Sequence, residues 1–444
     1  MLTQTVKVDI FSKTEIEMAE LKTSLGEDFQ HLRASRFTPI LAARAQHVIA
    51  ADIVESFIEV NRKNNQHLGN VSFQTGEASE MKVDANSIDL LFTNWLLMYL
   101  TDAEVIHLLK NALHWLSDGG YMHIRESCSE PSKRTALVMT NTPTGVYQVD
   151  SNPTHYRHIC QYLNLLKSIN LYDESTEMGH QFVIVWSKSV DTYIEAYGNW
   201  RQVQILVRKV SVAQSKNKLT SSPNDERHLS MVIKSETIAE QVKFDLRRET
   251  MRKFFHERIA DLHCQINSIL HLVLEDRLNV DAFELSEAFD CSIHSIETNP
   301  YSFNANLSRA VEKQDKRVRF YYAENIDGSM GESWLPLKLN FDLIVGCRLL
   351  ENSQNFEEFF ANLKEHMNST CKLLSLEAAD NEEVLEEALF KFGFTKIKIK
   401  EVTLEIMDEA SVWIDILAEH LPKLSLFYQS LAESDKLWFT VVAE

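Results

Sequence analysis

Residues 88–126, IDLLFTNWLLMYLTDAEVIHLLKNALHWLSDGGYMHIRE, decide the fold of the first half of the chain. Residues 88–93 are almost continuously apolar, which is typical of a strand covered on both faces. Thr101 and Glu104 have the spacing of a capping box, so a helix is predicted to begin directly after Thr101. The apolar residues that follow have helical spacing and predict one buried helix face.

Gly119 and Gly120 predict the end of this helix, because glycine readily adopts the left-handed conformation that closes helices. Residues 121–126 then predict a second strand. Further out, the pattern predicts other elements, namely strands at 46–51, 71–75 and 182–186 and helices at 54–64 and 162–169. Strands separated by helices of this length predict an α/β domain with a parallel or mostly parallel sheet and helices on both faces.

The second half repeats this pattern, which indicates a duplicated α/β domain. Residues 341–345 match 88–92. Residues 371–377 match 121–126, and each of these two segments ends in a glutamate. The spacing also agrees, because 37 residues separate Asp89 from the first glutamate and 35 separate Asp342 from the second.

A polar stretch at 212–228 predicts a linker, and a long charged helix is predicted to follow it at about 229–262. We therefore expect four segments: an atypical N-terminal segment at 1–35, a first domain at 36–211, the linker and connecting helix at 212–262, and a second domain at 263–444.

The composition limits the classes of function. The net charge of −19 over 444 residues argues against a nucleic-acid partner and against a polybasic membrane anchor, because both need a basic face. The longest apolar stretch falls short of the ~20 residues of a membrane span, and no signal-peptide core precedes it. The six cysteines form no C-x-x-C pair, so we expect buried reduced thiols rather than a metal site. These features predict a cytoplasmic protein without membrane insertion.

Ligands of doubly wound sheets bind at the carboxyl ends of the strands, so the residues there are the candidate site. They are Asp52 after the second strand, Glu77 and Ala78 after the third, Thr93, Asn94 and Trp95 after the fourth, and Arg125, Glu126 and Ser127 after the fifth. A carboxylate in the position of Asp52 can accept the two hydroxyls of a ribose. The alternative is that Asp52 only caps the following helix.

The consecutive residues His155, Tyr156 and Arg157 form a second candidate site. An anionic substrate that carries a proton could use all three: the guanidinium for a phosphate, the phenol for a hydrogen bond and the imidazole as a base. The alternative is an exposed loop that leads into the helix predicted at 162–169.

Four motifs resemble the phosphoethanolamine N-methyltransferases, most closely the nematode type with a catalytic first domain and a degenerate second one. They are FTNWLLMYLTD at 92–102, RESCSEPS at 125–132, NPTHYR at 152–157 and NWRQV at 199–203. The resemblance is specific over about 36–203 and loose in the second half. It implies methyl transfer from S-adenosyl-L-methionine to the amine of phosphoethanolamine, towards phosphocholine and phosphatidylcholine.

The resemblance also implies a fold and a set of site residues. The fold would be α/β, with two Rossmann-like class I methyltransferase domains. Asp52 would bind the ribose, Glu77 and Ala78 would lie by the adenine, and Asn94 would lie near the methionine part of the cofactor. His155 and Tyr156 would be catalytic, and Tyr156 and Arg157 would bind the phosphobase.

The chain departs from the family before residue 36. Arg36 matches the tail of the family's glycine turn, but His31, Arg33 and Ser35 stand at the three glycine positions. The polar residues 26–30 stand where an apolar strand should be, and the family's N-terminal lid has no counterpart. We therefore expect the first domain to lack its usual N-terminal strand and glycine turn, which would leave the neighbouring strands without ladder partners.

Two explanations compete for this departure. Residues 1–35 come from an alternative start that replaced the usual one, or the chain is a catalytically inactive homologue that acts as a partner of an active methyltransferase. The second domain also lacks a glycine turn. Glu297 stands at its ribose-binding position, but we expect this domain to be structural or dimerising.

Overall fold

The computed structural model describes most of both halves of the chain. The described residues are 4–9, 37–128, 139–142, 145–148, 155–173, 178–212, 258, 262, 265–274, 280–324, 326, 339–352, 356–404, 406–407 and 436–443. The chain divides into two compact units, residues 1–236 and 237–444. This division agrees with a two-domain protein, while the finer boundaries at 36, 212 and 263 stay predictions, because most of 213–264 lies outside the described residues.

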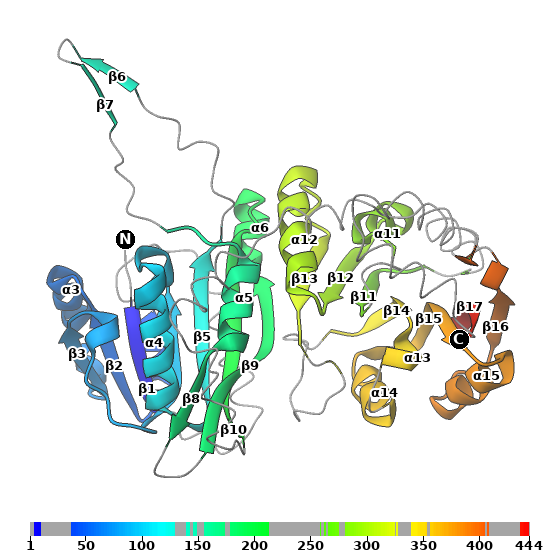
Figure 1. Cartoon of the computed structure of the whole chain (residues 1–444), viewed down its shortest axis with the longest axis horizontal. Helices are drawn as coiled ribbons and strands as arrows, with labels where there is room; N and C mark the ends of the chain where they lie inside the picture. The colour runs from blue at the N-terminus through cyan, green and yellow to red at the C-terminus, as the bar shows by residue number, and fades with distance from the viewer. Residues whose placement is uncertain are drawn as a thin grey trace. The chain divides into compact units, whose positions relative to one another are not determined.

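The first unit is a seven-stranded sheet in the order β3-β2-β1-β4-β5-β10-β9, with β8 paired to the outer side of β9. Figure 1 shows α4 and α5 in front of this sheet. The strands are β1 (Gln4–Asp9), β2 (His47–Asp52), β3 (Val71–Thr75), β4 (Ile88–Asn94), β5 (Leu116–Ser127), β8 (Asn170–Asp173), β9 (Met178–Ser189) and β10 (Gln202–Val212). A separate hairpin pairs β6 (Met139–Thr142) with β7 (Gly145–Gln148). The helices are α2 (Phe37–Ala42), α3 (Glu55–Asn65), η1 (Gln66–Leu68), η2 (Ala78–Glu80), η3 (Leu97–Tyr99), α4 (Asp102–Trp115), α5 (Ile159–Ser168) and α6 (Asp191–Tyr197).

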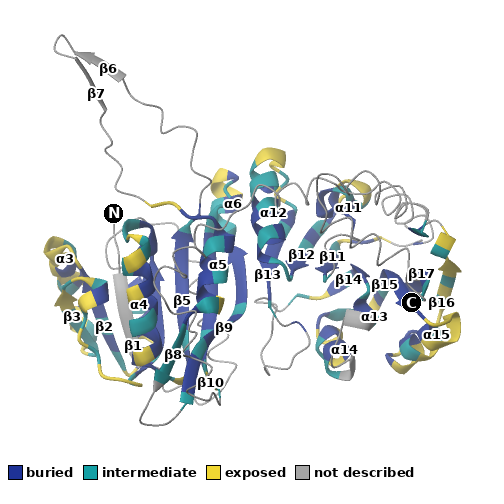
Figure 2. Cartoon of the chain, viewed as in Figure 1, coloured by how far each residue is buried: buried dark blue, intermediate teal, exposed yellow. Residues whose placement is uncertain are grey.

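The structure contains the strands predicted at 46–51, 71–75, 88–93, 121–126 and 182–186 and the helices predicted at 54–64 and 162–169. Most of the predicted linker and of the helix predicted at about 229–262 lies outside the described residues. The apolar run at 88–93 forms β4, whose Leu90, Leu91 and Phe92 are almost completely buried, so both faces of the strand are covered. In Figure 2, β5 is mainly buried, whereas β3 and α3 carry exposed residues. The apolar content of 88–93 is therefore explained by burial on both sides.

Helix α4 begins as predicted and ends earlier than predicted. The Thr101 N–H donates to Glu104 Oε2 at 2.7 Å, and the Glu104 N–H donates to Thr101 Oγ1 at 3.4 Å, which completes the capping box. The helix ends at Trp115, before the glycines. Gly119 has a φ of 78° inside β5, where the β4–β5 ladder shifts register, so this glycine serves a bulge rather than a helix end.

The centre of the first sheet is filled by a strand that the sequence did not predict. β1 lies between β2 and β4 and runs antiparallel to both, with Thr5 opposite Ala51 on one side and Thr93 on the other. The expectation that β2 and β4 lose their ladder partners is therefore wrong. The expectation of a mostly parallel sheet is also wrong for this unit, because only β2–β3 and β4–β5 are parallel among its described ladders.

The second unit has the same strand order, β13-β12-β11-β14-β15-β17-β16, which confirms the duplication. The first five of these strands are parallel, and β17 is antiparallel to both its neighbours. Its elements are β11 (Ser268–Val273), α11 (Ala282–Phe289), β12 (Ser292–Glu297), α12 (Pro300–Lys313), β13 (Val318–Tyr322), β14 (Phe341–Cys347), α13 (Leu349–Asn352), α14 (Phe356–Lys364), β15 (Met367–Ala379), α15 (Glu382–Lys391), β16 (Ile397–Glu401) and β17 (Leu437–Ala443). β14 and β15 are the strands that the repeat predicted. The antiparallel β1 is thus a departure from the pattern of the chain's own second domain.

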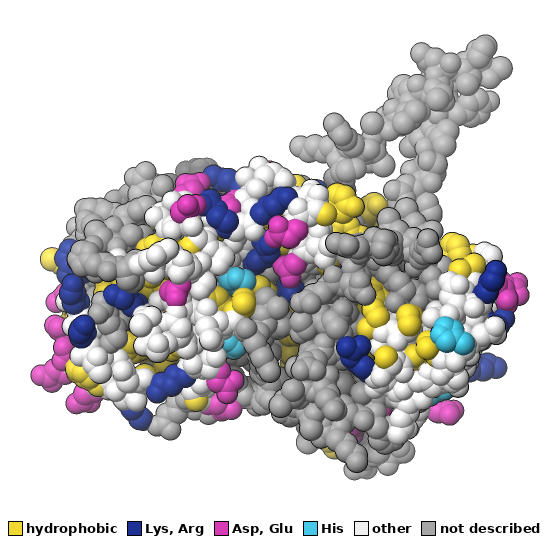
Figure 3. Space-filling model, turned by 180° about the vertical axis from the view of Figure 1, so that it is seen from behind, with side chains coloured by type: hydrophobic (Ala, Val, Ile, Leu, Met, Phe, Trp, Pro, Cys, Tyr) yellow, Lys and Arg dark blue, Asp and Glu magenta, His cyan; other side chains and the backbone are white. Residues whose placement is uncertain are grey.

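Other general features agree with the sequence. The five described cysteines are free and buried, as expected for structural thiols. Lys and Arg side chains are interspersed with Asp and Glu on the face that Figure 3 shows, so the coloured part of this face has no continuous basic area. Among the described helices, none is long and apolar enough to cross a membrane.

Candidate active site

The strands of the first unit bring the predicted cofactor residues to one edge of the sheet. Ala51 and Thr93 both lie opposite Thr5, so the residues that follow them, Asp52 and Asn94, flank the same end of β1. β3 is parallel to β2, which brings its carboxyl end to this edge as well. The described geometry therefore places the candidate residues of three strands together.

Asp52 holds the turn between β2 and α3. Its side chain is buried, and Oδ1 accepts the Val54 N–H at 2.9 Å. Helix α3 begins at Glu55 with Val54 as its N-cap and without a side-chain cap, so Asp52 is not the helix cap that the alternative reading proposed. The Asp52 carbonyl also accepts the Gly76 N–H at 3.1 Å, which ties the loop after β3 to the end of β2.

Glu77 and Ala78 directly follow Gly76, whose N–H makes this hydrogen bond. Glu77 is exposed and precedes the short helix η2, whose first residue, Ala78, is half-buried. The predicted position of both residues beside an adenine stays a prediction.

Asn94 carries a buried acceptor that the described residues leave unused. Its side chain is 6% exposed, and Oδ1 has no hydrogen-bond partner in the described part of the chain. A buried amide oxygen without a donor costs about 1–3 kcal/mol. A ligand with an N–H donor at this edge, such as the ammonium group of an amino acid, would remove that cost. Asn94 therefore fits the methionine part of the predicted cofactor.

Because β1 is antiparallel to its neighbours, the first unit differs from the second at the part of the ligand edge where a glycine turn would lie. In the second unit β11 is parallel to its neighbours, so the chain leaves it at the ligand edge after Val273. In the first unit the Gln4 end of β1 lies at that edge, and the chain leaves from the opposite end, after Asp9. The carboxyl end of the central strand therefore lies away from the ligand edge in the first unit. His31, Arg33 and Ser35 lie outside the described residues.

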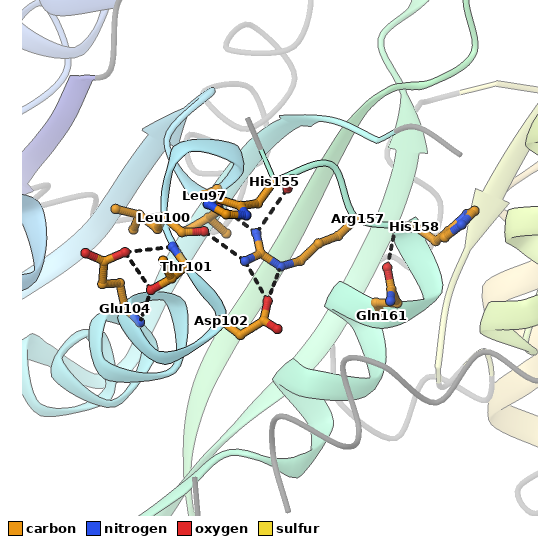
Figure 4. Close-up of polar contacts among 9 residues, drawn as sticks. All are labelled: Leu97, Leu100, Thr101, Asp102, Glu104, His155, Arg157, His158 and Gln161. Carbon is orange, nitrogen blue, oxygen red and sulfur yellow. Dashed lines mark hydrogen bonds and ion pairs between the residues drawn. The ribbon is translucent and has the colours of Figure 1, made fainter. Parts of the chain in front are cut away.

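Arg157 is buried and uses its donors within the protein, as Figure 4 shows. Nε and Nη2 donate to Asp102 Oδ1 at 3.0 and 2.7 Å. Nη1 donates to the carbonyls of Leu97 and His155 at 2.9 and 3.3 Å, and Nη2 also donates to the Leu100 carbonyl at 2.8 Å. This geometry favours a positioning role for Arg157, because a direct grip on a phosphate would require it to leave these acceptors.

His155 and Tyr156, by contrast, present their side chains to solvent. Both are exposed, and the His155 N–H donates to the Met98 carbonyl at 2.7 Å. The charge of His155 helps to lower the pKa of Glu104, after the larger effect of the hydrogen bonds from Thr101. The segment 155–157 is therefore held by its backbone and by Arg157 while its other two side chains stay accessible to a ligand.

Glu126, at the end of β5, is one of the predicted strand-end residues, but the sequence analysis assigned it no role. Its carboxylate is buried, and Oε1 accepts the N–H groups of Leu96 and Leu97 at 2.9 and 2.7 Å. Burial raises the pKa of Glu126 to about 7, although these hydrogen bonds and the charge of Arg157 oppose the rise. The repeated glutamate at the ends of 121–126 and 371–377 was the signal that could have suggested a role for it.

In the second unit, the carboxylate at the predicted ribose-binding position accepts hydrogen bonds from nearby side chains. Glu297 ends β12 and is buried, and its Oε1 accepts hydrogen bonds from Ser295 Oγ at 3.0 Å and Asn306 Nδ2 at 2.8 Å. These contacts engage one of the two carboxylate oxygens within the second unit. A structural or dimerising role of the second domain stays a prediction.

Comparisons with known proteins agree with this geometry. A family model described as a methyltransferase domain matches residues 34–120. Phosphoethanolamine N-methyltransferase 1 of Caenorhabditis elegans is 32% identical over 377 residues, which cover 83% of this chain and 77% of that protein. Phosphoethanolamine N-methyltransferase 1 of Triticum aestivum is 27% identical over 363 residues, which cover 78% and 67%. The solved structure of Haemonchus contortus phosphoethanolamine N-methyltransferase 1, in complex with phosphoethanolamine and S-adenosylhomocysteine, is 30% identical, with a TM-score of 0.76 over 97% of this chain and 91% of that one.

Proposed function

This chain belongs to the phosphoethanolamine N-methyltransferase family, and from that membership we propose that its first domain transfers a methyl group from S-adenosyl-L-methionine to the amine of phosphoethanolamine. One observation carries the assignment to this domain. Segment 155–157 is fixed to the turn that follows β4, the strand that ends in Asn94. The residues proposed to bind the cofactor and those proposed to bind the phosphobase are therefore connected through the turn that follows β4.

The cofactor residues divide by the part of the ligand they would hold. Asp52 would accept the ribose hydroxyls, Glu77 and Ala78 would lie by the adenine, and the Asn94 Oδ1 would accept from the methionine ammonium. When bound, S-adenosyl-L-methionine supplies a methyl group activated by its sulfonium sulfur. The chain's own part is to orient this group towards the amine and to exclude water.

The phosphobase residues have three tasks. The substrate amine must be neutral to attack, so its ammonium proton needs an acceptor, and His155 is the base we propose. The Tyr156 hydroxyl would donate a hydrogen bond to the phosphate and help to orient the amine. Arg157 would act mainly by holding the segment, with any direct phosphate contact depending on release of Asp102.

Isothermal titration of the full chain with S-adenosyl-L-methionine, and then with phosphoethanolamine added, tests the proposal together with a methyl-transfer assay. Micromolar cofactor binding and methylated product would support it. A folded sample that gives no heat at millimolar cofactor and no product would contradict it.

The direction of β1 favours a second candidate function. Because the carboxyl end of the central strand lies away from the ligand edge, the chain would bind cofactor weakly and act as a catalytically inactive homologue. Such a protein would bind the phosphobase, or associate with an active homologous methyltransferase and regulate it. The same titration separates the two functions, because the inactive protein would give heat with phosphoethanolamine or with the active enzyme but not with cofactor.

A further inference from the structure

We propose that Glu126 is a positioning residue for the phosphobase segment 155–157, acting through the turn that follows β4. This inference rests on the proposed function and extends it to a residue that we place in contact with neither ligand. Its carboxylate lies at the end of β5, and the turn it binds lies between β4 and α4.

The first step is the contact between Glu126 and the turn. Oε1 accepts two consecutive backbone N–H groups, those of Leu96 and Leu97, so a single oxygen fixes the direction of this peptide segment. Trp95, just before them, has a φ of 52° and donates its N–H to the Arg125 carbonyl at 2.8 Å. A left-handed conformation is unfavourable for a large side chain, so the turn needs such contacts to persist.

The second step leads from the turn to the substrate segment. Leu97 donates its N–H to Glu126 and accepts from Arg157 Nη1 through its carbonyl, so one residue takes part in both contacts. The Met98 carbonyl accepts the His155 N–H. A displacement of the turn would therefore move the backbone of His155 and the guanidinium of Arg157 together.

The second unit contains the same arrangement, a left-handed residue followed by two N–H groups that a glutamate binds, and so supplies an internal control. Arg348 also has a φ of 52°, and its N–H donates to the Leu376 carbonyl at 2.7 Å. The N–H groups of Leu349 and Leu350 donate to Glu377 Oε1 and Oε2, both at 3.2 Å. This arrangement therefore belongs to the fold, and within the described residues the first unit connects it to a proposed substrate segment.

The test compares substitutions at the two glutamates in the full chain. Glu126→Ala should raise the KM for phosphoethanolamine about tenfold or more, because misplacement of about 1 Å can have effects of this size or larger. Its affinity for S-adenosyl-L-methionine should stay within a factor of about two. Glu126→Gln keeps the Oε1 acceptor and should restore most of the wild-type KM. Glu377→Ala should leave both constants unchanged.

Hydrogen exchange without any ligand gives a readout independent of turnover. Glu126→Ala should speed exchange in peptides from 96–100 and from 155–160, whereas Glu377→Ala should affect 349–352 alone. If Glu126→Ala fails to fold, Glu126→Asp, which shortens the side chain by one methylene, serves in its place. Faster exchange in 96–100 but not in 155–160, or a KM unchanged in the Ala or Asp variant, would overturn the proposal. A wild-type chain without methyl transfer would contradict the proposed function, and the exchange data would still decide whether Glu126 holds both segments.

Discussion

Asp102 Oδ1 accepts two hydrogen bonds from Arg157, one from Nε at 3.0 Å and one from Nη2 at 2.7 Å. This pair joins the first turn of α4 to the segment that carries His155 and Tyr156. Because the arginine is buried and also binds backbone carbonyls, its contribution to stability and its contribution to substrate binding are coupled.

Arg157→Ala should therefore have two effects. Loss of the buried ion pair and of the donors to the Leu97 and Leu100 carbonyls should lower the free energy of unfolding of the first domain by about 3 kcal/mol. Phosphoethanolamine binding should weaken several-fold while cofactor affinity stays nearly unchanged. Urea denaturation and isothermal titration measure the two effects. Arg309→Ala, which breaks the Arg309–Asp281 ion pair of the second unit, is the matched control and should leave phosphoethanolamine binding intact. Equal loss of both affinities in Arg157→Ala would mean that the segment only stabilises the domain.

Asn94→Ala should weaken cofactor binding several-fold with little effect on stability. The reason is that Oδ1 has no hydrogen-bond partner in the described part of the chain. Replacing Asn94 by Ala therefore removes no hydrogen bond of Oδ1 within that part. Asn61 offers a contrast in the same domain, because it donates to Thr38 Oγ1 at 3.0 Å and accepts from Asn65 Nδ2 at 2.8 Å. Asn61→Ala should lower the free energy of unfolding by about 1–3 kcal/mol and leave cofactor affinity unchanged. Thermal unfolding and titration of both variants check this, and a reversal of the two patterns would remove Asn94 from the site.

The stability of the first domain should fall as the pH rises towards neutrality. Burial raises the pKa of Glu126 from 4.5 to about 7, so the folded state holds this proton more tightly than the unfolded state. The resulting stabilisation is fully present below pH 4.5 and is lost as the pH rises through about 7. Glu126→Gln should abolish this dependence, which amounts to about 3 kcal/mol. Urea denaturation at several pH values measures it, and identical pH profiles for wild type and variant would show that Glu126 titrates normally.

Local signals in the sequence were sufficient for several elements of the first sheet but not for β1. Ile88–Asn94 and the capping box at Thr101 depend on nearby residues only, and both were predicted closely. Gly119 misled the prediction because a positive φ serves a bulge as well as a helix end, and only the partner strand distinguishes them. β1 was missed because its six residues, QTVKVD, acquire their position only by pairing with strands about forty and ninety residues away.

The candidate site divides in the same way. Asp52 and Asn94 were identified because the carboxyl ends of strands can be located from the strands themselves. The positioning role of Arg157 was not predicted, since its acceptors Leu97, Leu100 and Asp102 lie more than fifty residues earlier in the chain. The residue type of Arg157 and its place in the sequence suggested a phosphate ligand. In the structure its side chain is buried and donates to acceptors within the protein.

The antiparallel direction of β1 can be tested by cross-linking. Cα atoms of directly opposed residues in an antiparallel pair lie about 4.5–5.5 Å apart, within the range of a disulfide. Thr5→Cys combined with Ala51→Cys should therefore form a disulfide on mild oxidation, because these residues are opposed in the register. Thr5→Cys combined with His47→Cys should not, since Asp9 lies opposite His47. Intact mass and electrophoresis without reductant distinguish the products, and each single variant controls for the native thiols. A link to His47 but not to Ala51 would show that β1 runs parallel to β2. The carboxyl end of the central strand would then lie at the ligand edge, as that of β11 does in the second unit.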